Sequence, residues 1–490
     1  MRALGSWRAI GCALWVLASA SCARSDATFG SRCGGDDECA SGVCGDGLCT
    51  VVCDGDGDCA TGWLCDTSAA ESICACTPLD ERCNGRDDDC DGAIDEEPAT
   101  LCGTTGGSGP ALTCSAGACV CASGGPPLHG RNTVDLLLVI DNSSTMAEEQ
   151  ATLAAELPRL IDILASGDAN EDGAADFPSV DSLHVGVVTT DMGVGGHDVP
   201  TCDRGTYGAD FGDDGVLVTR GRTAVPGCIA TYPSIFEFER SRDDVGTFAS
   251  DLACVATAGN AGCAFEQQLE ATLKALSPSA PQGWTMHGYE PPVFFRSTSG
   301  HADRWNAGLV RGSSVLAIVV LTDEEDCSAE DPALFDPESA TFGATELGLR
   351  CFTYPEATHP VERYVAGIGG NAGLLGLRHD PGRLVYGVIA GVPVGAIADP
   401  VAAADYDAVL AHPEMTEEID PATMTRLRPS CDVPAVGVAF PPRRLVRVAQ
   451  GLEQGGAETF VASICQSSYS TAIDALVDRV AVPLSRPECD

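Results

Sequence analysis

The chain has 490 residues, 44% of them hydrophobic, so two or more folded units are expected rather than a disordered chain or one compact core. Acidic residues outnumber basic ones by 71 to 28, which gives a formal net charge of −43. Because such a chain repels a phosphate backbone, the composition argues against a nucleic-acid partner and favours divalent cations as partners.

The N-terminus has the pattern of an export signal, in which two arginines precede the apolar run AIGCALWVLA and the small residues SASC. This run is too short to be a transmembrane helix. Cleavage after Ala20 would release a secreted or periplasmic protein, whereas cleavage before Cys22 would resemble bacterial lipoprotein processing. The second choice removes residues 1–21 together with Cys12 and lipidates Cys22, which leaves an even number of the 26 cysteines to pair. We therefore expect an exported outer-membrane or cell-surface lipoprotein, which contacts the membrane only through its lipid.

Residues 31–124 are rich in Cys, Gly and Asp and lack the periodicity of core-forming helices or strands. The segment CGGDDECASGVC, which starts at Cys33, recurs as CDGDGDCATGWLC from Cys53. Loops this short bury too little apolar area to fold unaided, so disulfides are expected to hold them. A Gly/Pro-rich linker at 125–133 follows.

The segment CNGRDDDCDGAIDEE at 83–97 has the spacing of a calcium loop, in which alternate acids point inward and a glycine makes the bend. The expected ligands are Asp87, Asp89, Asp91, Asp95 and Glu96. The segment resembles the Cys/Asp-rich metal-binding repeat of bacterial surface proteins, and its core is similar to thrombospondin and dockerin loops. The alternative is a solvated acidic turn between disulfides.

A second segment, GDANEDGAADF, has the same spacing and lies between a predicted helix and a predicted strand. The expected calcium ligands are Asp168, Asn170, Asp172 and Asp176. The alternative is a polar helix-to-strand turn.

Residues 134–487 alternate between apolar strands and amphipathic helices. The predicted strands are Val134–Ile140, Leu183–Thr189, Ser314–Leu321, Arg383–Ala390 and Glu458–Ser463, and the predicted helices are Ala147–Ala165, Val245–Ala256, Glu266–Leu276, Arg443–Glu453 and Thr471–Val480. This alternation predicts an α/β fold, a doubly wound, mostly parallel sheet with helices on both faces. Three Gly/Pro-rich insertions, expected to be loops at the ligand face, lie near 192–240, 277–312 and 392–440.

The strand in VDLLLVIDNSSTM ends in Asp141, Ser143 and Thr145, three oxygen-bearing side chains at alternate positions. Ligand sites in parallel sheets open at the carboxyl ends of strands. Hard oxygen ligands suit Mg²⁺ or Ca²⁺, with Mn²⁺ as a further candidate. The alternative interpretation is helix capping by Asp141 and Ser143.

Two other predicted strands also end in oxygen-bearing residues: VLAIVVLTDEED at Asp323, and LHVGVVTTDMG at Thr190 and Asp191. Together with the first motif, this set resembles the von Willebrand factor A domain family and its metal-ion-dependent adhesion site. The resemblance implies that Asp141, Ser143 and Thr145 bind an ion, and that Asp323 binds it directly or through water. It also implies a protein or other partner that presents an acidic group.

The chain departs from the family pattern at one ligand. In GNAGCAFEQQLEATLKAL, Cys263 stands where the family has a threonine. A disulfide-bonded cysteine is a poor ligand for a hard cation. Either Thr190 or Glu266 replaces the threonine, or the site has lost affinity.

Motifs of common enzyme classes are missing. The single lysine, Lys274, lies in ATLKAL rather than in a phosphate-binding loop, and neither HExxH nor GxSxG occurs. We therefore expect a metal-dependent binding or adhesion protein that is not an enzyme and binds no nucleotide. The alternative is a structural, calcium-stabilised envelope protein with an inactive adhesion site.

Sequence neighbours among the later cysteines suggest the pairs Cys202–Cys228, Cys254–Cys263, Cys327–Cys351 and Cys431–Cys465. The Cys-rich region and the larger domain each contain an odd number of cysteines, so at least one bridge between them is expected. Because the termini of a von Willebrand A domain lie close together, the resemblance implies that Cys489 bonds to Cys119 or Cys121.

Overall fold

In a computed structural model, the described residues are 132–486 except 201, 398–399, 401–403 and 435, with short stretches at 43–45, 48–53, 63–66, 72–76, 112–115 and 118–121. The chain divides into two compact units, Met1–Cys102 with Leu112–Cys119, and Gly103–Ala111 with Val120–Asp490. The export signal, the lipidation site Cys22, the aspartate loop 83–97 and the bridge from Cys489 lie outside the described residues. They remain predictions.

The Cys-rich part contains short strand pairs. They are β1 (Cys44–Gly45) with β2 (Leu48–Cys49), β3 (Trp63–Asp66) with β4 (Ile73–Cys76), and β5 (Leu112–Ser115) with β6 (Ala118–Cys121). The first two pairs are antiparallel. Cys44, Cys53 and Cys74 are disulfide-bonded, as expected of loops too small to fold without cross-links.

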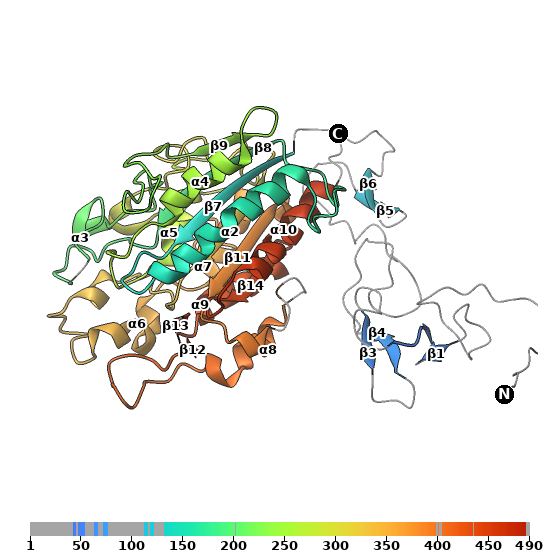
Figure 1. The fold of residues 1–490 in the computed structure, drawn as a ribbon. Helices are drawn as coiled ribbons and strands as arrows, with labels where there is room; N and C mark the ends of the chain where they lie inside the picture. Colours follow the sequence, from blue (N-terminus) through green and yellow to red (C-terminus); the bar gives the residue numbers. More distant parts are fainter. Residues whose placement is uncertain are drawn as a thin grey trace, which may run out of the picture. The chain divides into compact units, whose positions relative to one another are not determined.

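A six-stranded sheet forms the centre of the second unit (Figure 1). Its order is β14 (Glu458–Ser463), β11 (Leu384–Ala390), β10 (Val315–Leu321), β7 (Thr133–Ile140), β8 (Ser182–Thr189) and β9 (Phe236–Glu239). The first five strands are parallel, and β9 pairs with β8 in the antiparallel direction. The predicted mostly parallel α/β sheet is therefore confirmed. The short edge strand β9 lies in a segment that the sequence suggested was a loop.

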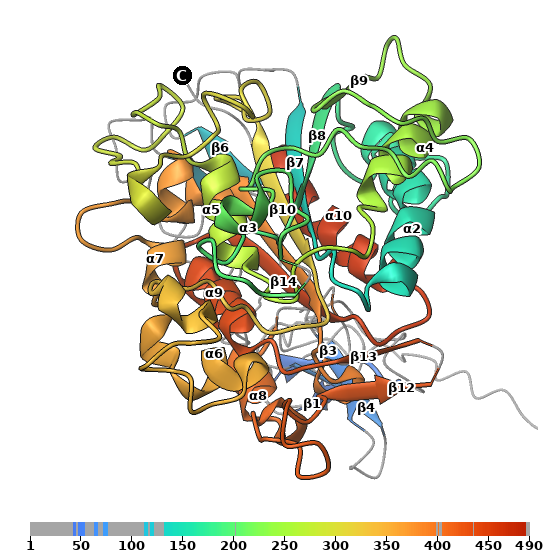
Figure 2. The same cartoon turned by 90° about the vertical axis from the view of Figure 1, so that its left-hand side faces the viewer.

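Helices cover both faces of this sheet (Figure 2). One face carries α2 (Ala147–Ser166), α4 (Val245–Ala256) and α10 (Ser470–Ser485), and the other carries α5 (Gln268–Leu276), α7 (Glu362–Val365) and α9 (Arg443–Gln454). Alternate residues of β7 serve the two cores: Leu136 and Leu138 pack on one side, Leu137 and Val139 on the other. Among the helices described, none combines the length and apolar character needed to cross a bilayer.

The insertions contain more regular structure than the sequence indicated. Short elements in and around them are α3 (Gly208–Phe211), α6 (Arg350–Thr353), α8 (Tyr406–Ala411) and the antiparallel hairpin of β12 (Cys431–Val433) and β13 (Gly437–Ala439). The 3-10 turns are η3 (Phe295–Ser297), η4 (Pro332–Phe335), η5 (Leu347–Leu349), η6 (Pro355–Ala357), η7 (Leu374–Leu377), η8 (Pro381–Arg383), η9 (Val394–Ala396) and η10 (Pro413–Met415). Local periodicity misses such elements because none is longer than six residues, too few to establish a repeating apolar pattern.

Among the described residues of the second unit, four disulfides are present. Cys327–Cys351 and Cys431–Cys465 confirm the predicted pairs. The predictions Cys202–Cys228 and Cys254–Cys263 are wrong, because the observed pairs are Cys202–Cys263 and Cys228–Cys254. Proximity along the chain failed because Cys254 lies on α4, against the 220–232 segment, while the loop of Cys263 returns to the strand ends.

Candidate metal centre

The strand order reverses between β7 and β10, because β7 continues to β8 on one side while β10 lies on the other. In doubly wound sheets a crevice opens at the carboxyl ends of the strands at this point. Asp141 follows β7 directly and Asp323 follows β10 after Thr322. The two predicted strand-end acids therefore lie beside each other at the reversal.

Asp141 is fully buried, and each of its carboxylate oxygens accepts one hydrogen bond. Oδ1 accepts from the Ser143 N–H (2.7 Å) and Oδ2 from the Thr322 hydroxyl (2.7 Å). Burial raises the pKa of Asp141 above its ordinary value. The Ser143 and Thr145 hydroxyl oxygens lie 3.3 Å apart. The alternate spacing therefore brings these three side chains together, as the sequence predicted.

Helix capping does not explain these residues. Helix α2 begins at Ala147, and its N-cap position, Met146, makes no side-chain capping hydrogen bond. Asp141 and Ser143 precede that position, so the capping alternative is wrong. Thr145 is exposed, which leaves the cluster accessible from solvent.

Asp323 is buried and its Oδ1 has no hydrogen-bond partner. Burial, followed by the negative charge of Asp141, raises the pKa of Asp323 to about 8, against the lowering effect of a hydrogen bond with Thr145. The Asp323 carboxylate therefore lies close to Asp141 and Thr145, residues of the motif that follows β7. An unpaired acid in this position is costly unless a proton or a cation neutralises it.

Glu266 belongs to the same cluster. It is buried, and its Oε1 has no hydrogen-bond partner. Burial raises the pKa of Glu266 well above its ordinary value, and the charges of Asp141, Glu324 and Asp323 raise it further. The two proposed substitutes for the missing threonine are Thr190 and Glu266. Of these, Glu266 is an acid that lies close enough to Asp141 for their charges to interact.

Thr190 and Asp191 lie next to this cluster. The Thr190 hydroxyl is buried without a hydrogen-bond partner. Asp191 Oδ1 accepts from the Gly193 N–H (2.9 Å), and its Oδ2 has no partner. Burial, with a smaller contribution from the charge of Asp213, raises the pKa of Asp191 to about 6, against the lowering effects of the Gly193 hydrogen bond and of Arg220. Asp191 therefore lies near a second group of charged residues, Asp213 and Arg220.

Cys263 is disulfide-bonded, so its sulfur is not available as a thiolate ligand. Its loop packs directly on the first motif, because the Gly262 N–H donates to the Asn142 carbonyl (2.8 Å) and a Cβ at Gly262 would lie 2.3 Å from Asn142 Oδ1. The disulfide to Cys202 joins the loop of Cys263 and Glu266, here called the third loop of the candidate metal centre, to the insertion after β8, while the Gly262 hydrogen bond holds this loop against the first motif.

The sequence analysis missed two acids near this cluster. Glu324 is partly buried, and its pKa is raised well above the ordinary value by burial and by Asp323 and Asp141, while Arg426 lowers it. Glu149 is buried on α2, and its Oε2 has no partner. The consecutive acids of TDEED could have indicated Glu324, but Glu149 lies within an ordinary amphipathic helix pattern.

These residues fit a divalent cation. In the described part of the chain, no arginine or lysine forms an ion pair with Asp141, Glu266 or Asp323. No three of the described His, Cys, Asp and Glu side chains form a ready coordination sphere by themselves. The available donors mix hydroxyl and carboxylate oxygens, which Mg²⁺, Ca²⁺ and Mn²⁺ accept. A bound ion would offset the repulsion that raises the pKa values of these acids.

The predicted calcium loop at 168–176 folds onto itself. Asp168 accepts from the N–H groups of Asp172 (3.2 Å) and Gly173 (2.8 Å), and Asp176 accepts from that of Ala169 (2.8 Å) and from the Asn170 amide (3.1 Å). Most of the loop is exposed. Its carboxylates already have backbone donors, so calcium binding there remains a prediction.

Two cavities flank the candidate metal centre. A cavity of about 270 Å³, here called the arginine cavity, is lined by Arg204, Arg220 and Arg222 together with Asn142 and Asp191. Because Asn142 lies between Asp141 and Ser143, this cavity shares a wall with the candidate metal centre.

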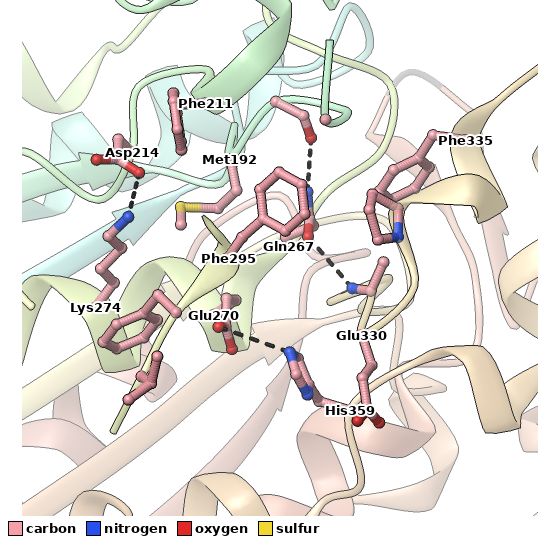
Figure 3. Close-up of a pocket in the computed structure, with 16 residues that line it drawn as sticks. Met192, Phe211, Asp214, Gln267, Glu270, Lys274, Phe295, Glu330, Phe335 and His359 are labelled. Carbon is pink, nitrogen blue, oxygen red and sulfur yellow. Dashed lines mark hydrogen bonds and ion pairs between the residues drawn. The ribbon is translucent and has the colours of Figure 1, made fainter. Parts of the chain in front are cut away.

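The other cavity, of about 200 Å³, is lined by phenylalanine and methionine side chains together with polar and charged ones (Figure 3). Its buried charges are paired: Lys274 Nζ donates to Asp214 Oδ1 (2.5 Å), and Glu270 accepts from Arg363 Nη2 (2.8 Å). The Gln267 side chain also lines this cavity, and its amide nitrogen donates to the Gly193 carbonyl (2.8 Å). This cavity therefore lacks the unsatisfied charges of the candidate metal centre.

In comparisons with known proteins, no family model matches the chain, and no curated protein is significantly similar to it. The fold and site define an α/β protein with an acidic, oxygen-rich cluster at the point where the strand order reverses. A more specific assignment depends on the chemistry of that cluster.

Proposed function

We propose that the second unit is a metal-ion-dependent binding domain of the von Willebrand factor A type, carried by an exported surface lipoprotein. The observation that carries this proposal is the set of buried, unpartnered oxygens on Asp323 and Glu266 beside Asp141. Buried polar atoms are rarely left without partners. A divalent ion held by these residues would supply oxygen atoms of this kind with a partner.

Asp141, Ser143 and Thr145 would hold the ion from the first loop, Asp323 from the second and Glu266 from the third. The hydroxyl ligands Ser143 and Thr145 contribute no charge, so the ion would keep net positive charge toward solvent as long as only one of the three acids binds it as an ionised carboxylate. The exposed side of the site at Thr145 then accepts an acidic group from a partner. The chain's own residues would hold the ion, and the acidic group of the partner would be a further ligand.

The alternative, a structural envelope protein with an inactive site, is favoured by one observation, the disulfide at Cys263 in place of a ligand. The two roles differ in whether the strand-end site binds an ion. Glu266 provides a carboxylate near the position that Cys263 leaves without a ligand.

Calorimetric titration of the mature full-length chain with Mn²⁺, Mg²⁺ and Ca²⁺ tests the proposal. We expect one strand-end site whose affinity falls at least a hundredfold in Asp141→Ala and in Asp323→Ala, with unchanged circular dichroism. Asp181→Ala is the matched control, because this acid is paired with Arg240 away from the site. Unchanged metal affinity in both site variants would leave the structural role.

A further inference from the structure

The arginine cavity concentrates positive charge in a strongly acidic chain. Three arginines, Arg204, Arg220 and Arg222, line it together with two acids, Asp191 and Asp213, so its lining has an excess of basic side chains although the chain has a formal net charge of −43. All three belong to the long insertion between β8 and β9. Guanidinium groups gathered in one concave site provide a local field that attracts an anion despite the repulsion from the rest of the surface.

The guanidinium groups keep donors for a ligand. Arg220 Nη2 lies 3.6 Å from Asp213 Oδ1 with a side chain 61% exposed, and Asp213 already accepts from the Thr189 and Thr206 hydroxyls (2.8 and 2.6 Å). The Arg222 guanidinium makes a single long hydrogen bond within the described residues, to Asn260 Oδ1 (3.4 Å). Within the described residues Arg204 has no ionic partner. Each guanidinium has five N–H donors, so most remain available.

Disulfides fix the segments that carry these arginines. Cys202–Cys263 joins the segment before Arg204 to the third loop of the candidate metal centre. Cys228–Cys254 joins the segment after Arg222 to α4, and the Arg222 N–H donates to the Cys254 carbonyl (3.0 Å). The cavity is therefore held in place before any ligand binds, which lowers the entropic cost of binding.

We propose that the arginine cavity binds a second carboxylate from the same acidic partner segment whose first carboxylate completes the coordination of the ion. This inference rests on the proposed function. The shared wall at Asn142 and Asp191 brings the two anion sites within reach of one peptide. Arginine forks suit carboxylates because they form two parallel charge-assisted hydrogen bonds. The recognised feature is thus a pair of acidic side chains rather than a single one.

Capped, fluorescently labelled Ser/Gly hexapeptides test this with the mature full-length chain and Mn²⁺. One peptide carries a single Asp, and the others carry a second Asp one to four residues later. We expect at least one spacing to bind about tenfold tighter than the single-Asp peptide in fluorescence anisotropy. Arg220→Gln and Arg222→Gln should each remove most of that gain while leaving Mn²⁺ affinity and single-Asp binding unchanged.

Arg242→Gln is the matched control, because this exposed arginine pairs with its neighbour Asp243 and does not line the cavity. If the wild type fails to bind Mn²⁺, the proposed function falls and this inference with it. If Mn²⁺ and the single-Asp peptide bind but no spacing gives a gain, or the gain survives the Arg220→Gln/Arg222→Gln double variant, only the arginine-cavity proposal is overturned. Tighter binding of a phosphoserine in place of the second Asp would overturn the choice of a carboxylate.

Discussion

A buried aspartate lies at each end of strand β7, and the two have opposite surroundings. Asp135, near the start of the strand, is fully buried and accepts from the Arg311 N–H (2.5 Å), from Arg311 Nε (2.6 Å) and from the Ser314 hydroxyl. Arg378 lies 3.8 Å away. Asp141, just after the strand, is equally buried, but the charges coupled to it are carboxylates.

This difference distinguishes a buried acid that stabilises the fold, Asp135, from a buried acid that is available to bind a ligand, Asp141. A carboxylate can be buried without large cost only when a cation or several donors accompany it. At the start of β7 the chain supplies two arginines, so the site is complete. At the end of β7 the chain supplies further acids, so the neutralising charge has to come from a proton or a bound ion.

A substitution at the start of β7, where Asp135 is paired with arginines, should have the largest effect on the free energy of unfolding. Asp135→Ala leaves Arg311 and Arg378 without their shared carboxylate, and Arg378 is almost fully buried. We expect a loss of about 3–5 kcal/mol in the free energy of unfolding. The loss should be the same in EDTA and in Mn²⁺, measured by urea denaturation.

The matched substitution at the other end is Asp141→Ala. Because it removes one of several repelling carboxylates, the EDTA-treated protein should lose less than about 1 kcal/mol or become more stable. The stabilisation that Mn²⁺ gives the wild type should disappear. Equal destabilisation of the two variants in EDTA would contradict the contrast between the two strand ends.

Removing the disulfide at the candidate metal centre should affect both stability and the ion. The double variant Cys202→Ser/Cys263→Ser opens a cross-link between residues 61 positions apart. We expect a loss of about 2–4 kcal/mol in the free energy of unfolding and weaker Mn²⁺ binding, because the third loop, which carries Glu266, is no longer tied to the insertion after β8.

Cys228→Ser/Cys254→Ser is the control, with a separation of 26 residues. It should destabilise the fold to a similar extent and leave Mn²⁺ affinity unchanged, since it ties the arginine-bearing segment to α4. Identical metal affinities in both double variants would show that Cys202–Cys263 has no role at the candidate metal centre.

The pH dependence of stability distinguishes the two ends without mutation. Burial and neighbouring acids raise the pKa of Asp323 to about 8, and the pKa values of Glu266 and Glu324 also rise. An acid with a raised pKa holds its proton more tightly when folded. The metal-free protein should therefore lose stability as the pH rises from about 4 to about 8, by at most about 1.4 kcal/mol per pH unit for each titrating group.

Saturating Mn²⁺ should flatten this slope, because the ion takes the place of the protons. Denaturant titrations at several pH values, with EDTA or Mn²⁺, measure the effect. A metal-free stability that is flat or rises across this range would mean that these acids are neutralised within the fold.

The smallest effect is expected at the 168–176 loop, where the acids are mostly exposed and already have backbone donors. If the loop binds calcium at millimolar strength, 10 mM Ca²⁺ should stabilise the wild type by about 1 kcal/mol. Asp168→Asn/Asp172→Asn should abolish that gain, as measured by thermal unfolding in Ca²⁺ and in Mg²⁺. A Ca²⁺ response that persists in the variant would assign it to another site.

Sequence periodicity determined most of the second unit. The five parallel strands and the five long helices lie within a few residues of their predicted bounds. Each is long enough for its apolar residues to repeat several times along the element. The edge strand β9 was missed because four residues are too few for a pattern. The motif of Asp141, Ser143 and Thr145 was also readable, since its alternate spacing is local.

Only the tertiary structure decided what surrounds that motif. Glu149 and Glu266 join the cluster from different helices or loops, and the disulfide partner of Cys263 is Cys202 rather than its sequence neighbour Cys254. The sequence could state that acids end the strands. It could not state that Asp135 has arginine partners and Asp141 has none, because pairing depends on which distant segments pack together, and that is fixed by the folded chain.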